Sequence, residues 1–333
     1  MAADGRVLPA GRFTGPGGAG AGVADQVRDD AVLSLFADGA TVVLQGLHRL
    51  WDPIRDLAAD LADELGHPVQ VNAYITPPQS QGFAPHYDTH DVFVLQVAGR
   101  KHRRVHAPVL VDPMPDQPWG QVADDVAARA AEQPQIDTIL TQGDCLYLPR
   151  GFIHSAAALA EISVHLTFGI HNVTQRDVVS AALDELRAHG WESTLPVGWD
   201  PRGDLSGIRE LLAEAAARLT ALDPGTVADR LLARRAAAQR PEPVAPLATV
   251  QAAERITADD RVRLRRHLIA RLDHEVLRVG DTHRVDVTLA QIPAVELLLP
   301  GKPQRVGDLP GEDPVGLVAR LMREGVVVLT EDD

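Results

Sequence analysis

Residues 84–105 read APHYDTHDVFVLQVAGRKHRRV and place two histidines and an aspartate directly ahead of an apolar run. Alternate residues of an extended chain point to the same side, so His86 and Asp88 are expected to reach one common point. A metal ion requires this kind of convergence between imidazole and carboxylate groups. The chain contains 13 histidines and 46 acidic residues, so a chance pair in a solvated turn is the alternative interpretation of this stretch alone.

The segments around this stretch have the pattern of a β protein. Apolar residues at helical spacing predict a helix over 51–66, and residues 69–77 alternate as a strand. Residues 91–99 are almost continuously apolar, which is typical of a strand buried on both faces. Strands are expected again within 137–156 and 161–170, separated by Gly, Pro and Asp turns. Short strands with such turns predict an all-β sandwich or barrel.

The pattern changes after about residue 173, where three amphipathic helices are expected. A proline-rich linker follows at 241–246, and the last part mixes strands with a helix. We therefore predict three domains: a β-rich catalytic domain over 1–172, a helical domain over 173–240 and a winged-helix-like α+β domain over 241–333. A Gly-rich loop or arm is expected within the first domain at 11–22.

The composition is typical of a globular protein without a membrane span, with 45% hydrophobic and 23% charged residues. The first residues lack the apolar core of a secretory signal. Cys145 is the only cysteine, so no intrachain disulfide is possible and a cytoplasmic location is expected. The net charge of −14 argues against nucleic-acid binding by this chain and suits a basic protein partner. Alternatively, the acidic surface only favours solubility.

A second informative stretch, residues 143–156, reads GDCLYLPRGFIHSA. Gly143 and Asp144 indicate a turn, and the Pro-Arg-Gly segment bends the chain so that His154 follows on the next strand. Taken alone, His154 is more typical of a buried or capped histidine. Together with His86 and Asp88 it completes two histidines and one carboxylate, the arrangement in which non-haem Fe(II) oxygenases hold iron while leaving other positions open.

At this point the chain resembles the cupin-like JmjC-domain oxygenases, and within them the ribosomal oxygenases. The resemblance is carried by residues 72–105, NAYITPPQSQGFAPHYDTHDVFVLQVAGRKHRRV, and by residues 143–156. It extends to the order of the domains, since that family follows its JmjC domain with a helical dimerisation domain and a winged-helix domain. It implies a mainly β, double-stranded β-helix core (the cupin or jelly-roll fold) and a homodimer.

The resemblance also implies roles for individual residues. His86, Asp88 and His154 are then the Fe(II) ligands, and Lys101 pairs with the far carboxylate of the co-substrate 2-oxoglutarate. Asn72 and Tyr74 fall on the strand that lines the co-substrate pocket. A carboxylate enclosed in a barrel requires a cation and hydrogen bonds. Lys101, expected at the end of the strand over 91–101, can supply the cation and Tyr74 the hydroxyl. Arg100 is the rival cation, but adjacent strand residues point to opposite faces, so only one of the two can enter the barrel.

Other histidines are less clearly assigned. His90 extends the face of His86 and Asp88 and is read as a rim or substrate-side residue, or alternatively as part of a solvated loop. His165 is expected to line the pocket near the iron, with a satisfied core histidine as the alternative. His171 and His102 are expected to be structural or exposed.

Two non-histidine residues and two departures from the family pattern complete the expectations. Cys145 is expected to pack in the core and Asp144 to form the turn before its strand. Arg103 stands where many family members have Trp, and the loop after His154, SAAALAEIS, is short. Both departures are expected to lie away from the iron ligands and to affect the choice of substrate.

The leading hypothesis is an oxygenase that uses Fe(II), O2 and 2-oxoglutarate to hydroxylate a protein side chain. By resemblance the substrate is an Arg or His of a ribosomal protein, a basic partner that suits a negative chain. Hydroxylation of a small molecule or peptide natural product and JmjC-type demethylation are the alternative activities, because fold does not fix substrate. A metal-binding cupin without oxygenase activity and a winged-helix regulator that binds DNA are the alternatives outside oxygenase chemistry.

Overall fold

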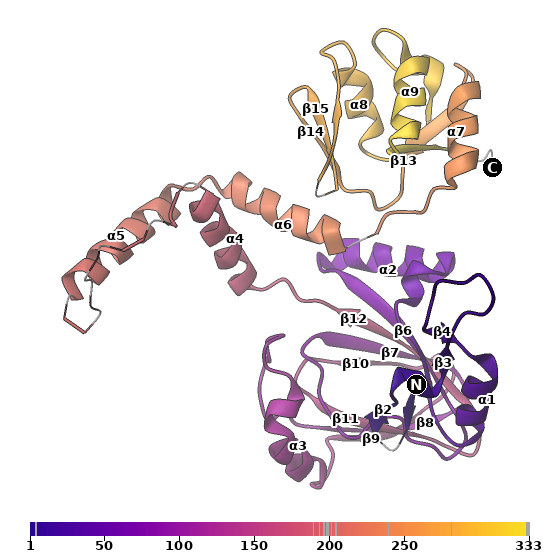
Figure 1. Ribbon diagram of the computed structural model, residues 1–333. Helices are drawn as coiled ribbons and strands as arrows, with labels where there is room; N and C mark the ends of the chain where they lie inside the picture. The colour runs from indigo at the N-terminus through magenta and orange to yellow at the C-terminus, as the bar shows by residue number, and fades with distance from the viewer. Residues whose placement is uncertain are drawn as a thin grey trace. The chain divides into compact units, whose positions relative to one another are not determined.

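The computed structural model divides into two compact units, Met1–Asn172 and Val173–Asp333, which are described separately (Figure 1). Residues 1–330 are described, apart from residues 4, 189, 193, 196, 198, 199, 201, 204, 239 and 281. Among the described residues, no helix combines the length and apolar character needed to cross a membrane.

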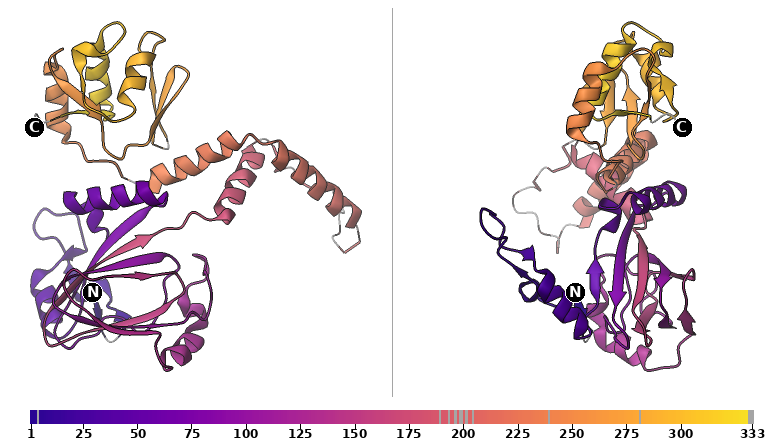
Figure 2. Two further views of the ribbon diagram at one scale, coloured as in Figure 1. Left: turned by 180° about the vertical axis from the view of Figure 1, so that it is seen from behind. Right: turned by 90° about the vertical axis from the view of Figure 1, so that its right-hand side faces the viewer.

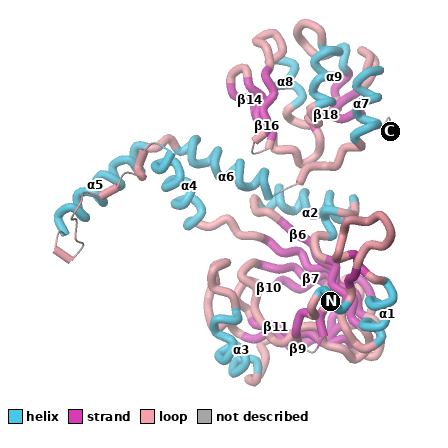
Figure 3. The backbone as a smooth tube through the Cα atoms, viewed as in Figure 1, coloured by secondary structure: helices cyan, strands magenta, loops and turns pink. Residues whose placement is uncertain are grey.

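The first unit is built on a five-stranded antiparallel sheet with the strand order β10-β7-β12-β6-β5. Its strands are drawn in magenta in Figure 3, where β6, β7 and β10 are labelled. Its strands are β5 (Val42–Leu44), β6 (Val69–Thr76), β7 (Asp91–Ala98), β10 (Cys145–Leu148) and β12 (Ser163–Ile170). Strand β12 lies between β6 and β7, so that His165 is opposite Tyr74 on one side and Gln96 on the other. The strands expected over 69–77, 91–99 and 161–170 are confirmed.

Helix α2 (Asp52–Leu65) covers the outer face of this sheet, as both views of Figure 2 show. Ile54, Ala58 and Ala62 of the helix form one buried cluster with Val71 and Phe168 of the sheet. Because side chains alternate along a strand, burial of this apolar set turns the intervening residues of β6 and β12 toward the other face. The polar residues of these two strands therefore point to the inside of the unit.

A second, three-stranded antiparallel sheet has the strand order β11-β8-β9. Its strands are β8 (Lys101–His106), β9 (Ile136–Leu140) and β11 (Ile153–Ala158). The sequence analysis placed Lys101 at the end of the preceding strand, and this is wrong: the chain turns at Gly99, where φ is +62°, and Lys101 begins β8. The loop expected after His154 also needs correction, because residues up to Ala158 belong to β11.

Short elements close the first unit. The N-terminal segment forms small two-stranded ribbons, β1 with β2 and β3 with β4, and the Gly-rich stretch lies in the second ribbon and its loop. Their bounds, with those of the helices, are β1 (Ala2–Ala3), β2 (Arg6–Val7), η1 (Ala10–Arg12), β3 (Thr14–Gly15), β4 (Gln26–Val27), α1 (Asp29–Ala37), η2 (Leu47–Arg49), η3 (Trp119–Val122) and α3 (Ala123–Ala130). Gly5 forms a bridge with Phe83, which brings the N-terminus beside the segment that leads to His86.

The second unit begins with the three expected helices, α4 (Gln175–Ala188), α5 (Leu205–Ala221) and α6 (Pro224–Ala238). After them, three helices and two three-stranded sheets share one apolar core that includes Val262, Val306 and Val318. These elements are α7 (Pro246–Arg255), β13 (Arg261–Leu264), β14 (Ala270–Asp273), β15 (Val276–Val279), β16 (His283–Asp286), α8 (Ile292–Leu298), β17 (Gln304–Arg305), η4 (Val306–Asp308), α9 (Pro314–Arg323) and β18 (Val327–Leu329).

Candidate active site

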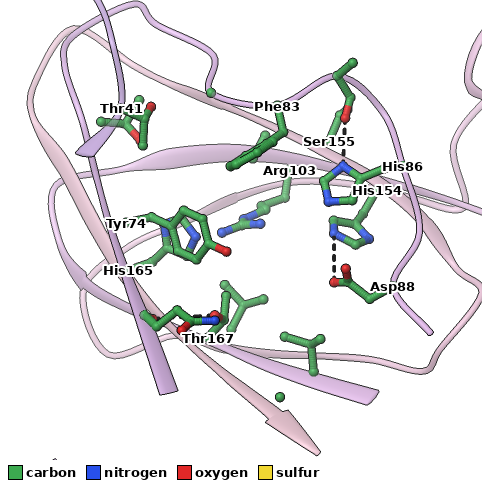
Figure 4. A pocket seen from close by; sticks show the side chains of 18 of the residues that line it. Thr41, Tyr74, Phe83, His86, Asp88, Arg103, His154, Ser155, His165 and Thr167 are labelled. Atoms are coloured by element: carbon green, nitrogen blue, oxygen red, sulfur yellow. Dashed lines mark hydrogen bonds and ion pairs between the residues drawn. The ribbon is translucent and has the colours of Figure 1, made fainter. Parts of the chain in front are cut away.

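A cavity of about 350 Å³ is enclosed by residues from the inner faces of both sheets of the first unit. Its volume lies within the range of small-molecule binding sites. Asp88 is the one carboxylate among its described lining residues, whereas Lys101 and Arg103 both contribute cations. Figure 4 shows His86, His154 and Asp88 at one end and Tyr74 with His165 at the other.

His86, Asp88 and His154 converge, with one ligand-type atom of each lying within 4.8 Å of the others. An isolated antiparallel bridge between His86 and His154 brings the two distant segments together, with backbone N–O distances of 3.2 and 2.8 Å. His86 and Asp88 do not lie on a regular strand, but the expected alternation still holds. Tyr87, which stands between them, is 2% exposed and packs against Ile153 on the other side of the backbone.

Backbone carbonyls orient both imidazole rings. Nδ1 of His86 lies 2.7 Å from the carbonyl oxygen of Ala84, and Nδ1 of His154 lies 3.1 Å from that of Phe152. Each Nδ1–H therefore donates to a carbonyl, which leaves the Nε2 lone pair of each ring free for a metal. Nε2 of His154 faces the carboxylate of Asp88 at 3.8 Å. That separation is too long for a hydrogen bond and suits two ligands of one ion.

Burial, followed by the neighbouring His86, lowers the pKa of His154 to about 4. The ring is therefore neutral at pH 7 and able to ligate a metal. Two imidazoles and one carboxylate, with the side toward the cavity left open, fit a ferrous ion.

Lys101 lies deep in the cavity and is 3% exposed. Its Nζ donates to the hydroxyl of Thr76 at 2.8 Å and lies 3.4 Å from Nδ1 of His165. Burial, and then the charge of Arg103, lowers the pKa of Lys101 to about 7. Arg100 points outward and pairs with Glu161 at 2.7 Å, so the structure brings Lys101 and not Arg100 into the cavity.

Tyr74 and Asn72 both line the cavity from β6. The ring of Tyr74 stacks on His165, with centroids 4.8 Å apart and an angle of 7° between the rings. Burial and then the charge of Asp88 raise the pKa of Tyr74, so its hydroxyl stays protonated and can donate. The side-chain oxygen of Asn72 accepts a hydrogen bond from the backbone N–H of Gly46 at 3.0 Å, which fixes the side chain and leaves its amide nitrogen able to donate to a ligand.

Among the cavity residues to which the sequence analysis assigned no role in the site are Arg103 and Thr76. Arg103 was expected to lie away from the iron ligands, but it lines the same cavity and is 4% exposed. Strand alternation links each of them to a residue that was assigned from the sequence. On a strand that begins at Lys101, residue 103 shares its face, and on the strand of Asn72 and Tyr74, residue 76 shares theirs.

The remaining histidines divide between the cavity and the outside. His165 lines the cavity, and burial followed by the charges of Arg103 and Lys101 lowers its pKa well below its usual value, so the ring is neutral. His90 also lines the cavity and stacks on the exposed ring of His171 at 5.0 Å. His102 pairs with Asp137 on the outer face of β8.

The two expectations for residues 144 and 145 have opposite outcomes. Asp144 accepts hydrogen bonds from the N–H and hydroxyl of Thr141 at 2.7 and 2.9 Å, which confirms its turn role. Cys145 does not pack in the core, because its side chain is exposed. Strand β10 is the edge strand of its sheet, and alternation turns Leu146 and Leu148 toward the apolar cluster and Cys145 away from it.

Aromatic side chains surround the metal-binding side of the cavity. Phe83 lies 5.9 Å from His86, and Trp119 lies 6.3 Å from it, measured between ring centroids. Trp119 is 37% exposed, so part of its ring is accessible from outside. An entering side chain would therefore meet apolar surface beside the candidate metal ligands.

Residues 49–178 match the JmjC domain family. A segment of 151 residues is 34% identical to the bifunctional lysine-specific demethylase and histidyl-hydroxylase NO66 of Drosophila mojavensis, and covers 42% of this chain and 16% of that protein. Another alignment, of 137 residues, is 43% identical to ribosomal oxygenase 1 of Gallus gallus and covers 41% of this chain and 22% of that protein. The match thus spans only about a fifth of the length of these curated relatives.

Solved structures resemble a larger part of the chain. The crystal structure of Escherichia coli ribosomal oxygenase YcfD has a TM-score of 0.54 at 20% identity, covering 87% of this chain and 78% of that chain. The same E. coli protein in complex with cobalt and 2-oxoglutarate has a TM-score of 0.50 at 18% identity, with the same coverage. At these identities the likeness shows the fold alone, and it confirms the jelly-roll core.

Proposed function

We propose, from the premise that residues 49–178 form a JmjC domain, that this chain is an Fe(II)- and 2-oxoglutarate-dependent oxygenase that hydroxylates a protein side chain. One observation carries the proposal. Three ligand-type side chains converge in a cavity that also holds a buried lysine. A metal-chelating dicarboxylate requires these two features together.

In this proposal His86, Asp88 and His154 hold the iron. Bound iron would supply the activation of O2 that couples oxidation of 2-oxoglutarate to succinate and CO2 with hydroxylation of a substrate carbon. The protein's own part is to fix both rings by their Nδ1 hydrogen bonds, so that the Nε2 atoms and the carboxylate face one point.

The same proposal gives the co-substrate to Lys101, Tyr74 and Asn72, with Thr76 added. The ammonium of Lys101 would meet the far carboxylate of 2-oxoglutarate. The hydroxyls of Tyr74 and Thr76 line the same cavity from β6 of the other sheet. A buried carboxylate is costly unless a cation and hydrogen-bond donors meet it, and these residues provide both.

For the substrate we propose a basic protein, with an Arg or His of a ribosomal protein as the modified residue. The names of the relatives support this choice, since they include ribosomal oxygenases and a histidyl-hydroxylase. A net charge of −14 favours association with a basic partner. The part-exposed Trp119 beside His86 offers an apolar and π-rich surface to the incoming side chain.

The test is incubation of the full chain with Fe(II), 2-oxoglutarate, O2 and a mixture of ribosomal proteins, followed by mass spectrometry. The expected result is one added oxygen atom on one residue, together with succinate. Loss of a methyl group from lysine instead would indicate demethylation. Oxygen added only to a small molecule or free peptide would indicate the other hydroxylase alternative.

Two controls separate oxygenase chemistry from metal binding alone. His154→Ala is expected to abolish both the added oxygen and metal retention. Arg100→Ala changes a cation next in sequence to Lys101 but outside the cavity, and it is expected to leave both unchanged. No succinate with iron bound and the full set of substrates would favour a metal-binding cupin and contradict the proposal.

We also propose that α4, α5 and α6 form a homodimerisation domain. These helices expose large apolar side chains, and a second copy of the chain would cover them: Val178, Val179, Leu183, Leu205, Leu211, Leu212 and Leu232. Light scattering of the full chain is expected to give twice the monomer mass, and a monomer would contradict this assignment.

We further propose that residues 241–333 form a winged-helix-like domain that does not bind DNA. Of the two arginines of α9, Arg320 is engaged within the unit, donating to the carbonyl of Asp286 at 2.8 Å and to the side chain of Gln291 at 2.9 Å. Tight, salt-dependent DNA binding in a mobility-shift assay would contradict this proposal. We expect a cytoplasmic location on the basis of the single cysteine, which cell fractionation would test.

A further inference from the structure

Arg103 is a buried cation with unsatisfied donors. Its side chain is 4% exposed, and its Nε and Nη2 atoms have no hydrogen-bond partner within the described part of the chain. A guanidinium is charged at all physiological pH values, and burying it without a partner is unfavourable. Asp88 is the one carboxylate among the described residues that line the cavity, and it faces Nε2 of His154. An anionic ligand in the cavity would therefore give Arg103 the partner that these residues do not.

The register of the small sheet places Arg103 between Lys101 and the metal end of the cavity. Across from β8, strand β11 pairs Ala158 with Lys101, Ala156 with Arg103 and His154 with Val105. Residues 101, 103 and 105 share one strand face and are spaced about 7 Å apart. A ligand that reaches from the metal ligands to Lys101 would therefore pass Arg103.

The guanidinium is directed toward the Lys101 side of the cavity. Figure 4 shows it pointing toward Tyr74 and His165 and away from Asp88. Its charge lowers the pKa of Lys101 and of His165 and, as the smallest of the causes there, the pKa of His154. Two cations and the hydroxyls of Tyr74 and Thr76 thus face the same part of the cavity.

We infer that Arg103 is a second cation for the far carboxylate of the co-substrate, which it holds together with Lys101. This inference rests on the proposed function and assigns a binding role to a residue at a position where Trp is frequent in the resembled family. A planar guanidinium can donate two parallel hydrogen bonds to a carboxylate, which a lysine cannot do. A site with both cations would then prefer a dicarboxylate over a monocarboxylate more strongly than a site with one lysine does.

The test measures binding without turnover, by calorimetry on the Mn(II)-loaded full chain. Arg103→Met is expected to lower the affinity for 2-oxoglutarate by about tenfold or more, which is the effect of losing one charge-assisted hydrogen bond. Affinity for 2-oxobutyrate, which keeps the 2-oxo acid but lacks the far carboxylate, should stay within about threefold because that ligand offers Arg103 no partner. Arg104→Met is the matched control, since Arg104 lies on the outer face of the same strand and pairs with Asp137.

Thermal unfolding separates ligand binding from a purely structural role. Without ligand, Arg103→Met should melt at a higher temperature than the unmodified chain, because an unpaired buried charge has been removed. Addition of 2-oxoglutarate should raise the melting temperature of Arg103→Met less than it raises that of the unmodified chain. A lower melting temperature without ligand, or an equal loss of affinity for both 2-oxo acids, would overturn the inference.

The same experiment distinguishes failure of this inference from failure of the proposed function. If the unmodified Mn(II) protein does not bind 2-oxoglutarate, the proposed function fails and the inference with it. If that protein binds and Lys101→Met weakens binding while Arg103→Met does not, the proposed function stands and the role of Arg103 is refuted.

Discussion

The pH dependence of 2-oxoglutarate binding follows from the low pKa of Lys101. Burial and the charge of Arg103 lower it to about 7 in the free protein, so the ammonium is about 90% charged at pH 6.0 and about 3% charged at pH 8.5. Because the far carboxylate pairs with the charged form, affinity should fall by about thirtyfold between these pH values. Binding at pH 8.5 should also take up close to one proton.

Calorimetry of the Mn(II)-loaded chain in buffers of different ionisation enthalpy measures both quantities. Lys101→Arg is the matched control, since its guanidinium stays charged over the whole range and should remove the pH dependence while retaining binding. A flat affinity profile in the unmodified chain, or the same profile in both proteins, would refute the reasoning.

Stability of the unliganded chain should change in the opposite direction. Between pH 7 and 10.5 Lys101 is neutral in the folded chain and charged in the unfolded chain, so the unfolded state binds more protons. The contribution of this residue to the free energy of unfolding therefore rises with pH through this window, by about 1.4 kcal/mol per pH unit. Urea unfolding of the unmodified chain and of Lys101→Arg at pH 7.0 and 8.5 measures this contribution. If the free energy of unfolding falls with pH in the unmodified chain but not in Lys101→Arg, the low pKa assigned to Lys101 is contradicted.

Three further outcomes are expected. His154→Ala should lose metal on desalting while its circular dichroism spectrum is retained, because the apolar clusters of the two sheets contain none of the three ligand residues. Metal content measures this, and full retention of metal would remove His154 from the ligand set. Gly99→Ala should lower the free energy of unfolding by about 2 kcal/mol or more. The reason is that φ at this residue is +62° and an added Cβ would lie 2.1 Å from the carbonyl oxygen of Ile162. An unchanged midpoint of urea unfolding would contradict that geometry. Cys145 should react with a maleimide in the folded chain without loss of 2-oxoglutarate affinity, because its side chain is exposed on an edge strand; protection until unfolding would contradict its position.

Local periodicity explains which parts of the fold were predictable. The apolar alternation of 69–77 and 161–170 and the helical spacing of 51–66 are properties of neighbouring residues, so they predict β6, β12 and α2 without tertiary information. Strand β8 was missed because KHRRVH contains only one aliphatic residue. Its inward face carries Lys101 and Arg103, so the usual apolar signal of a buried strand is absent.

The candidate site likewise combines a part that local sequence predicts with a part that depends on contacts between distant segments. The spacing of His86 and Asp88 is enough to put their side chains on one side of an extended chain, with Tyr87 on the other. The third member, His154, was assigned through its motif and family resemblance, since nothing local connects the two stretches. Pairing of their backbones across one bridge brings the rings together.

By itself, therefore, the sequence determined which side chains share a face of each strand and helix, because that depends on backbone geometry over a few residues. The tertiary structure decided which faces meet. It placed Arg103 in the cavity, Arg100 outside it and Cys145 on an exposed edge. These outcomes depend on strand order and sheet packing, which join residues far apart in the chain and leave no periodic signal in it.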